Sequence, residues 1–187
     1  MTPHQQLMDI LAAADCHHIH SVYAGIGSRK TPDYGIALIR RISRALSERG
    51  WTLRSGGADG ADAAFAKGIA RKDEFLPWPN FNDVHGARLN RPTIMAMVIA
   101  SQHHPNWKNL GDTVRRLHAR NVHQILGADC KSPSAMVVCW TPAGSTGITT
   151  ARTGGTGQAL RIAFAHGVPI FNLQRKDHRE AWEEVIR

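Results

Sequence analysis

The sequence predicts an α/β fold in which a parallel sheet of about five strands carries helices on both faces. Two observations lead to this prediction: short apolar runs alternate with amphipathic stretches of helical period, and glycine-rich turns follow the apolar runs. Strands that are separated by helices in this way are joined by right-handed crossovers and lie parallel in one sheet.

The first half of the chain is expected to supply three strands and two helices. The strands are predicted at residues 21–27, 51–55 and 75–78, and the helices at residues 33–49 and 60–70. Pro32 suits the first turn of the first helix, and Gly50 suits its end. The prolines of the third run indicate that this strand soon leaves the sheet.

The alternation breaks near residue 80 and returns near residue 135. The intervening sequence predicts loops at 80–92 and 103–111 and helices at 93–102 and 112–126. The last part adds strands at 135–140 and 168–173 and a helix at 158–166. The prediction is one Rossmann-like domain over residues 21–175 with a helical insertion at about 80–134, an N-terminal arm or helix at 1–20, and a C-terminal helix at 176–187.

Composition narrows the class of protein. Of the 187 residues, 42% are hydrophobic and 20% are charged, which is typical of a globular chain and excludes collagen, coiled coil and disorder. The formal net charge of +8 favours polyanionic partners such as nucleic acid or phosphorylated ligands. The three cysteines lack a metal-like spacing and indicate reduced thiols. The sequence has no run of about 20 apolar residues, the length needed to span a membrane. No secretion signal is evident either, so we expect a soluble, cytoplasmic protein with no membrane partner.

Three glycine-rich turns follow predicted strands, where ligands bind in an open α/β sheet. Backbone amides in such turns, and the N-terminus of the helix that follows, attract anions. Arg29 stands beside the first turn and Arg152 beside the third. We therefore expect these turns to hold a phosphate group through Gly25, Gly27, Ser28, Arg29, Ser55, Gly56, Gly57, Asp62, Gly154, Gly155, Thr156, Gly157 and Gln158.

Other nucleotide chemistries fit the sequence less well. A dinucleotide fold would place a third glycine where Lys30 stands and an acid where Arg54 and Ser55 stand. No G-x-x-x-x-G-K-[ST] motif is present, so ATP hydrolysis is disfavoured too, and no cofactor is predicted. No metal is predicted, because His103, His104, His118, His123 and Cys130 do not form a zinc motif.

Three features have alternative interpretations. On the predicted helix 112–126, Arg116, Arg120 and Asn121 either reach a phosphate and a base or form a solvated face. Trp78 and Trp107 either stack on bases or anchor the core. Asp59 and Asp62 are candidate catalytic groups only if the protein is an enzyme, and they could instead cap the helix that follows.

The first two glycine turns resemble the DNA-processing protein A family (DprA, also called Smf). Residues 25–35 read GIGSRKTPDYG and residues 55–62 read SGGADGAD, in the order and at the separation of that family's two motifs. The third turn, TGGTG at 153–157, resembles the loop of the Lonely-guy proteins. Both families belong to the SLOG superfamily of Rossmann-like, nucleotide-binding proteins. Stand-alone cores of this kind, often from phages and prophages, are labelled DNA recombination-mediator protein A.

The resemblance implies a protein that binds single-stranded DNA or a nucleotide, with a role as a recombination mediator and with self-association left open. The alternatives are a sensor or sequestering protein for a small nucleotide-derived ligand, and an N-glycosidic hydrolase or transferase acting on a nucleoside phosphate. The Lonely-guy hydrolases carry a glutamate where this chain has Arg161, which disfavours the hydrolase. A binding protein is therefore preferred over an enzyme, and the choice stays open.

Overall fold

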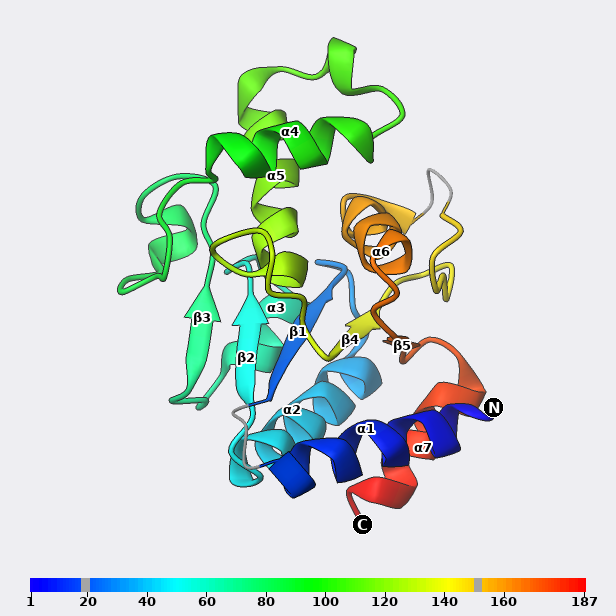
Figure 1. Ribbon diagram of the computed structural model, residues 1–187. Coiled ribbons are helices and arrows are strands. Elements are labelled where there is room, and N and C mark those ends of the chain that lie inside the picture. The colour runs from blue at the N-terminus through cyan, green and yellow to red at the C-terminus, as the bar shows by residue number, and fades with distance from the viewer. Residues whose placement is uncertain (18–20, 150–152) are drawn as a thin grey trace.

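The computed structural model describes residues 1–17, 21–149 and 153–187, and its centre is a parallel sheet of five strands (Figure 1). The strand order is β3-β2-β1-β4-β5. The strands are β1 (Val22–Gly27), β2 (Thr52–Ser55), β3 (Lys72–Glu74), β4 (Met136–Trp140) and β5 (Ile170–Asn172). The predicted Rossmann-like α/β class and the predicted number of strands are confirmed.

Helices cover both faces of the sheet because alternate strand residues point to opposite sides. Tyr23 of β1 belongs to one hydrophobic cluster, whereas its neighbour Ala24 belongs to the other. The first cluster lies against α1 (Pro3–His17), α2 (Asp33–Glu48), α3 (Ala61–Ala66) and α7 (Lys176–Val185). The second cluster lies against α4 (Ile94–Gln102), α5 (Asp112–Leu126) and α6 (Thr156–Ala165). Burial on both faces explains why the central strands read as continuous apolar runs.

The third strand was predicted in the wrong place. It lies at Lys72–Glu74 and not at residues 75–78. As an edge strand it has only one neighbour, β2, so polar residues can form it. Phe75 continues the pairing by donating its amide to Ser55 O at 3.0 Å and bridges to Leu89. The apolar signal of 75–78 comes instead from packing: Leu76 and Trp78 contact Phe81 in a small separate cluster.

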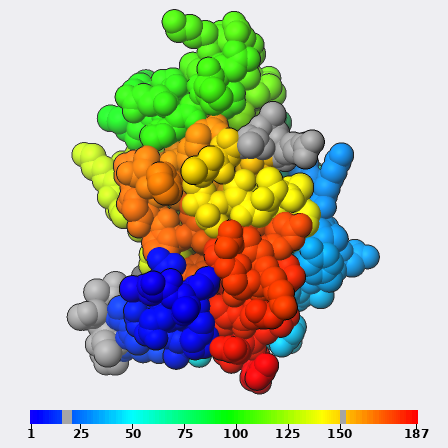
Figure 2. Space-filling model, turned by 90° about the vertical axis from the view of Figure 1, so that its right-hand side faces the viewer, coloured from blue at the N-terminus to red at the C-terminus, as the bar shows by residue number. Residues whose placement is uncertain are grey.

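The segment between β3 and β4 contains α4, α5 and two 3₁₀ turns, η1 (Phe81–Asp83) and η2 (Trp107–Asn109). α4 lies across α5 at the top of the molecule in Figure 1, and this part projects beyond the rest in Figure 2. The C-terminal half of α5, from Ala119 to Leu126, is buried against the sheet, whereas its first turn is exposed. α5 therefore places polar side chains next to the ends of the strands.

The two ends of the chain lie together. α1 packs beside α7 at the lower edge of the molecule (Figures 1 and 2), and His4 Nδ1 lies 2.9 Å from Glu184 Oε2 between them. The boundaries drawn at residues 20 and 175 stay a prediction. None of the described helices has the length and apolar character needed to cross a membrane.

Candidate functional site

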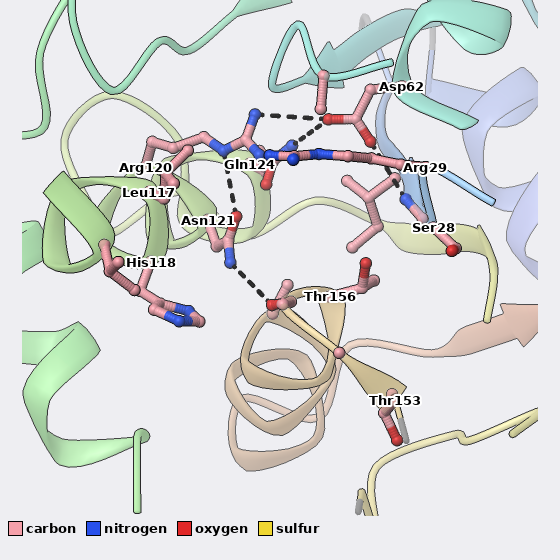
Figure 3. Close-up of a pocket in the computed structure, with 17 residues that line it drawn as sticks. Ser28, Arg29, Asp62, Leu117, His118, Arg120, Asn121, Gln124, Thr153 and Thr156 are labelled. Carbon is pink, nitrogen blue, oxygen red and sulfur yellow. Dashed lines mark hydrogen bonds and ion pairs between the residues drawn. The ribbon is translucent and has the colours of Figure 1, made fainter. Parts of the chain in front are cut away.

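A pocket of about 390 Å³ lies at the carboxyl end of β1 (Figure 3). Its walls come from the turn after β1, the start of α3, the inner face of α5 and the turn that opens α6. This is the place where an open α/β sheet binds its ligands. The lining consists of Ile26, Gly27, Ser28, Arg29, Ala58, Asp62, Val114, Leu117, His118, Arg120, Asn121, Gln124, Thr153, Gly154, Gly155, Thr156 and Ala159.

The first glycine turn presents a serine and an arginine to the pocket. The Ser28 amide donates to Trp140 O at 3.0 Å, and the Ser28 hydroxyl accepts the Lys30 amide at 3.0 Å. These bonds fix the turn and leave the Arg29 side chain exposed at the mouth. In Figure 3 that side chain extends across the pocket toward Arg120 and Gln124.

A buried ion pair lies at the inner end of the pocket. Arg120 Nη1 and Asp62 Oδ2 are 3.5 Å apart, and only 8% of Arg120 and 3% of Asp62 are exposed. Asp62 also accepts hydrogen bonds from the Gly27 amide at 3.2 Å and from Gln124 Nε2 at 3.5 Å. Burial raises the pKa of Asp62, and the guanidinium of Arg120 opposes that shift. Burial and the nearby cation of Arg29 lower the pKa of Arg120, while Asp62 raises it.

The second glycine turn makes room for this pair. Arg120 donates from Nη1 to the carbonyl oxygen of Gly56, and a Cβ atom at position 56 would overlap the guanidinium. The same Cβ would lie 2.5 Å from Gln124 Nε2. A side chain at this position would therefore displace Arg120. Gly56 shapes the pocket from behind and does not line it.

A chain of side-chain hydrogen bonds links α5 to α6. Arg120 Nε donates to Asn121 Oδ1 at 3.2 Å, and Asn121 Nδ2 donates to Gly155 O and to Gln158 Oε1, each at 3.3 Å. His118 Nδ1 lies 3.1 Å from the same Gln158 oxygen. Burial and the neighbouring His104 lower the pKa of His118 to about 4, so its ring is neutral at pH 7. The polar wall is thus uncharged except at Arg120.

The third glycine turn opens α6 at the pocket. Gly154, Gly155 and Thr156 line it, and a Cβ added at either glycine would meet open space. Gly154 has the left-handed φ of +68° that glycine adopts readily, whereas Gly155 is already helical at φ −61°. The unpaired amides at the N-terminus of α6 favour an anion. Arg152, which the sequence placed beside this turn, lies outside the described residues.

The structure brings together only part of the predicted site. Nine predicted residues line the pocket: Gly27, Ser28, Arg29, Asp62, Arg120, Asn121, Gly154, Gly155 and Thr156. Gly25, Ser55, Gly56, Gly57, Gly157 and Gln158 are buried or packed behind the wall, and the exposed Arg116 lies outside. Asp59 is also exposed and outside, so it does not meet Asp62 in the pocket.

Sequence reasoning missed several lining residues. They are Ile26, Ala58, Val114, Leu117, His118, Gln124, Thr153 and Ala159. A usable signal was present for most of those on α5, because Val114, Leu117, His118, Asn121 and Gln124 recur at helical spacing and share one stripe. Once Asn121 was a candidate, its neighbours on that stripe were candidates too.

Two other side chains considered in the sequence analysis, Arg161 and His123, are hydrogen-bonded to residues outside the pocket lining. Arg161 does not line the pocket: its Nε donates to His103 O at 2.7 Å, and its Nη1 donates to Thr149 Oγ1. His123 Nε2 accepts the Thr93 amide at 3.1 Å, and its Nδ1 donates to Gly127 O at 2.8 Å. Within the described ranges, no three His, Cys, Asp or Glu side chains gather as metal ligands would.

The fold and this site define a Rossmann-like α/β protein with an arginine-bearing pocket at the strand ends. Residues 13–74 match the family model described as DNA recombination-mediator protein A, which confirms the resemblance that the first two glycine turns predict. The matched segment contains β1, β2, β3, Arg29 and Asp62, and it ends before α4 and α5. Comparison with curated proteins found no match.

One solved structure is similar over most of the chain. It is DNA processing protein A from Helicobacter pylori, whose description concerns a single-stranded DNA binding mode. The TM-score is 0.54 at 19% sequence identity, and the alignment covers 95% of this chain and 76% of that one. At this identity the likeness establishes the fold. Membership of the SLOG superfamily and a phage origin stay predictions.

Proposed function

We propose that this protein binds single-stranded DNA, holding one nucleotide unit in the pocket at the strand ends, and that it acts as a recombination mediator. The observation that carries the proposal is the charge of the pocket. Arg29 and Arg120 bring two guanidinium groups to the lining, and among the described lining residues Asp62 is the one carboxylate. The excess positive charge, together with the amides at the start of α6, suits a phosphodiester.

In this proposal Arg29 is the group that meets the phosphate. It is exposed, and no carboxylate within the described residues pairs with it. Arg120 is already bound by Asp62 and by Gly56 O. It therefore contributes positive electrostatic potential and shapes the pocket, and does not itself bind the phosphate. Leu117 and Val114 offer apolar surface to the sugar or the base, and Asn121 offers a hydrogen-bonding amide beside them.

The comparisons support a DNA ligand. The family model named for recombination mediation covers the segment that carries Arg29 and Asp62. The similar H. pylori protein is described by its binding of single-stranded DNA, and its fold extends over nearly the whole of this chain. The net charge of +8 is positive, which favours binding of the negatively charged DNA strand.

Salt dependence tests the proposal. A fluorescent single-stranded oligonucleotide is titrated with the protein at about 50 mM and 200 mM salt, because log K falls by about 0.7 per neutralised phosphate. A slope that corresponds to several phosphates, with weaker binding of the matched duplex, is the expected result. Absence of binding at low salt would remove DNA as the ligand.

A small nucleotide is the second candidate ligand, because a pocket of about 390 Å³ has the size of a small-molecule site. Mass spectrometry of material released from the purified protein would reveal it. Hydrolysis of a nucleoside phosphate has less support, since Asp59 lies outside the pocket and Asp62 is paired with Arg120. Free base released from nucleoside monophosphates, and lost in Asp62→Asn, would revive that alternative.

A further inference from the structure

A second hollow, of about 570 Å³, lies at the outer end of the inserted segment. It is formed by residues 101–109, which comprise the end of α4, the loop that follows and η2. In Figure 1 this loop lies at the top of the molecule, away from β2 and β3. The hollow is outside residues 13–74, so the family match says nothing about it.

An aromatic ring borders the hollow and is held in place by a neighbouring arginine. Trp107 is half-buried, and the guanidinium of Arg115 lies 5.9 Å from the centre of its ring. Arg115 also donates to Trp107 O at 3.3 Å and to Lys108 O at 3.0 Å. Arg115 is not part of the hollow's lining, so it does not fill the hollow. The indole is therefore a fixed aromatic surface, of the kind on which bases stack.

The remaining lining suits a nucleotide. Lys108 contributes an exposed cation, and Asn106 and Asn109 contribute amides that are bonded to each other at 2.6 Å. Among the residues that the structure describes, no acidic side chain lines the hollow. An aromatic ring beside a cation and neutral amides is the combination by which proteins hold single-stranded nucleic acid without reading its sequence.

A pair of histidines connects the hollow to the pocket at the strand ends. His104 lines the hollow, His118 lines the pocket, and their ring centres are 4.4 Å apart. Burial lowers the pKa of both rings, to about 4 for His118, so both are neutral at pH 7. A strand that leaves the pocket over this pair would meet no charge of either sign from the two rings before it reaches Trp107.

We propose that the hollow at residues 101–109 is a second subsite for the same DNA strand, in which Trp107 stacks on a base and Lys108 meets a phosphate. The proposal rests on the proposed function, because it needs a single strand in the first pocket. It adds a binding site to the inserted segment and predicts that affinity depends on the length of the strand.

The test compares a mononucleotide, deoxythymidine monophosphate, with an oligothymidylate of eight residues. Trp107→Leu removes the stacking surface but keeps an apolar side chain against the core. It is expected to weaken binding of the oligonucleotide by about 5- to 150-fold and to leave the mononucleotide unaffected. Trp107→Phe should recover most of the loss, and Lys108→Ala should lower the salt slope by about 0.7. Arg29→Ala should weaken both ligands.

Each contrary outcome is distinct. If Trp107→Leu and Lys108→Ala both bind the oligonucleotide as the wild type does, the second subsite is overturned while the proposed function stands. Equal losses for both ligands in folded Trp107→Leu protein would place Trp107 in the first pocket's framework and would also overturn it. A wild-type protein that binds no oligonucleotide would overturn both proposals. If Trp107→Leu does not fold, Lys108→Ala decides the matter on the same two ligands.

Discussion

At the residue scale, the ion pair of Asp62 and Arg120 determines the shape of the inner end of the pocket. The Asp62 carboxylate accepts the Gly27 amide of the first turn and faces Arg120 and Gln124 of α5. Three parts of the chain that are far apart in sequence are thereby fixed around one buried carboxylate. Removing one partner alone should destabilise the fold, because a buried charge that has lost its partner is strongly unfavourable.

Arg120→Met tests this arrangement. The variant leaves Asp62 buried without its guanidinium, so the free energy of unfolding should fall by about 3–5 kcal/mol. Urea denaturation monitored by tryptophan fluorescence measures it. The double variant Asp62→Asn, Arg120→Met should recover part of the loss, since the uncompensated charge is then gone. A loss below about 1 kcal/mol in the single variant would show that the pair does not bear on stability.

The sequence predicts the two members of this pair as site residues but does not predict that they contact each other. Asp62 and Arg120 were both candidates from sequence, Asp62 because it follows a glycine turn and Arg120 because it lies on a cationic helix. Their contact could not be predicted, since it joins positions 58 residues apart and depends on how α5 crosses the sheet. Arg116 had the same sequence signal as Arg120. The structure places Arg116 in solvent because it precedes Arg120 by one turn, where α5 has left the sheet.

At the scale of elements, the turn that opens α6 has room for an added side chain at its glycines. Gly155 and Gly111 are both helix N-caps with negative φ, and a Cβ would meet open space at each. They differ in position, because Gly155 lines the pocket and Gly111 does not. This makes them a matched pair in which the same substitution separates binding from folding.

Gly155→Val should weaken oligonucleotide binding by at least about tenfold, or about 1.4 kcal/mol, because the branched side chain enters the space an anion would occupy. Gly111→Val should bind as the wild type does. Thermal denaturation of both variants provides the control for folding. Wild-type affinity in Gly155→Val would show that the third glycine turn does not contact the ligand.

Elements were predicted best where burial is continuous. Residues 135–140 read as a strand because β4 is covered on both faces. Helix 112–126 was predicted with its observed bounds from its helical period, although its first turn is exposed. β3 was misplaced because edge pairing tolerates the polar residues 72–74, while the apolar run that follows packs against η1. The helix expected at 60–70 ends at Ala66, where Lys67 adopts an extended conformation.

At the scale of the whole molecule, buried and partly buried histidines should make stability depend on pH. Burial lowers the pKa of His103, His104, His118, His123 and His178. These rings bind protons in the unfolded chain near pH 6.5 but resist protonation in the fold. Their contribution to stability is thus present above about pH 6.5 and is lost as the pH falls toward 4. Burial raises the pKa of Asp62, so this group alone would make the fold more stable as the pH falls.

Urea denaturation between pH 7.5 and pH 4 should therefore show a free energy of unfolding that falls with pH, with the steepest part below about pH 6.5. His118→Asn should reduce the slope, because it removes the ring whose pKa is lowered to about 4. A wild-type stability that is flat or rises over this range would contradict the account of the buried rings.

The central claim is that the pocket at the strand ends binds single-stranded DNA through Arg29. The most direct measurement is a titration of a fluorescent oligothymidylate at physiological salt with the wild type, Arg29→Ala and Arg116→Ala. Both variants lose one exposed positive charge, but only Arg29 lines the pocket. Arg29→Ala should weaken binding by about 1.5–3 kcal/mol, and Arg116→Ala should change it by no more than about 0.5 kcal/mol. Wild-type affinity in a folded Arg29→Ala protein, or equal losses in the two variants, would contradict the claim.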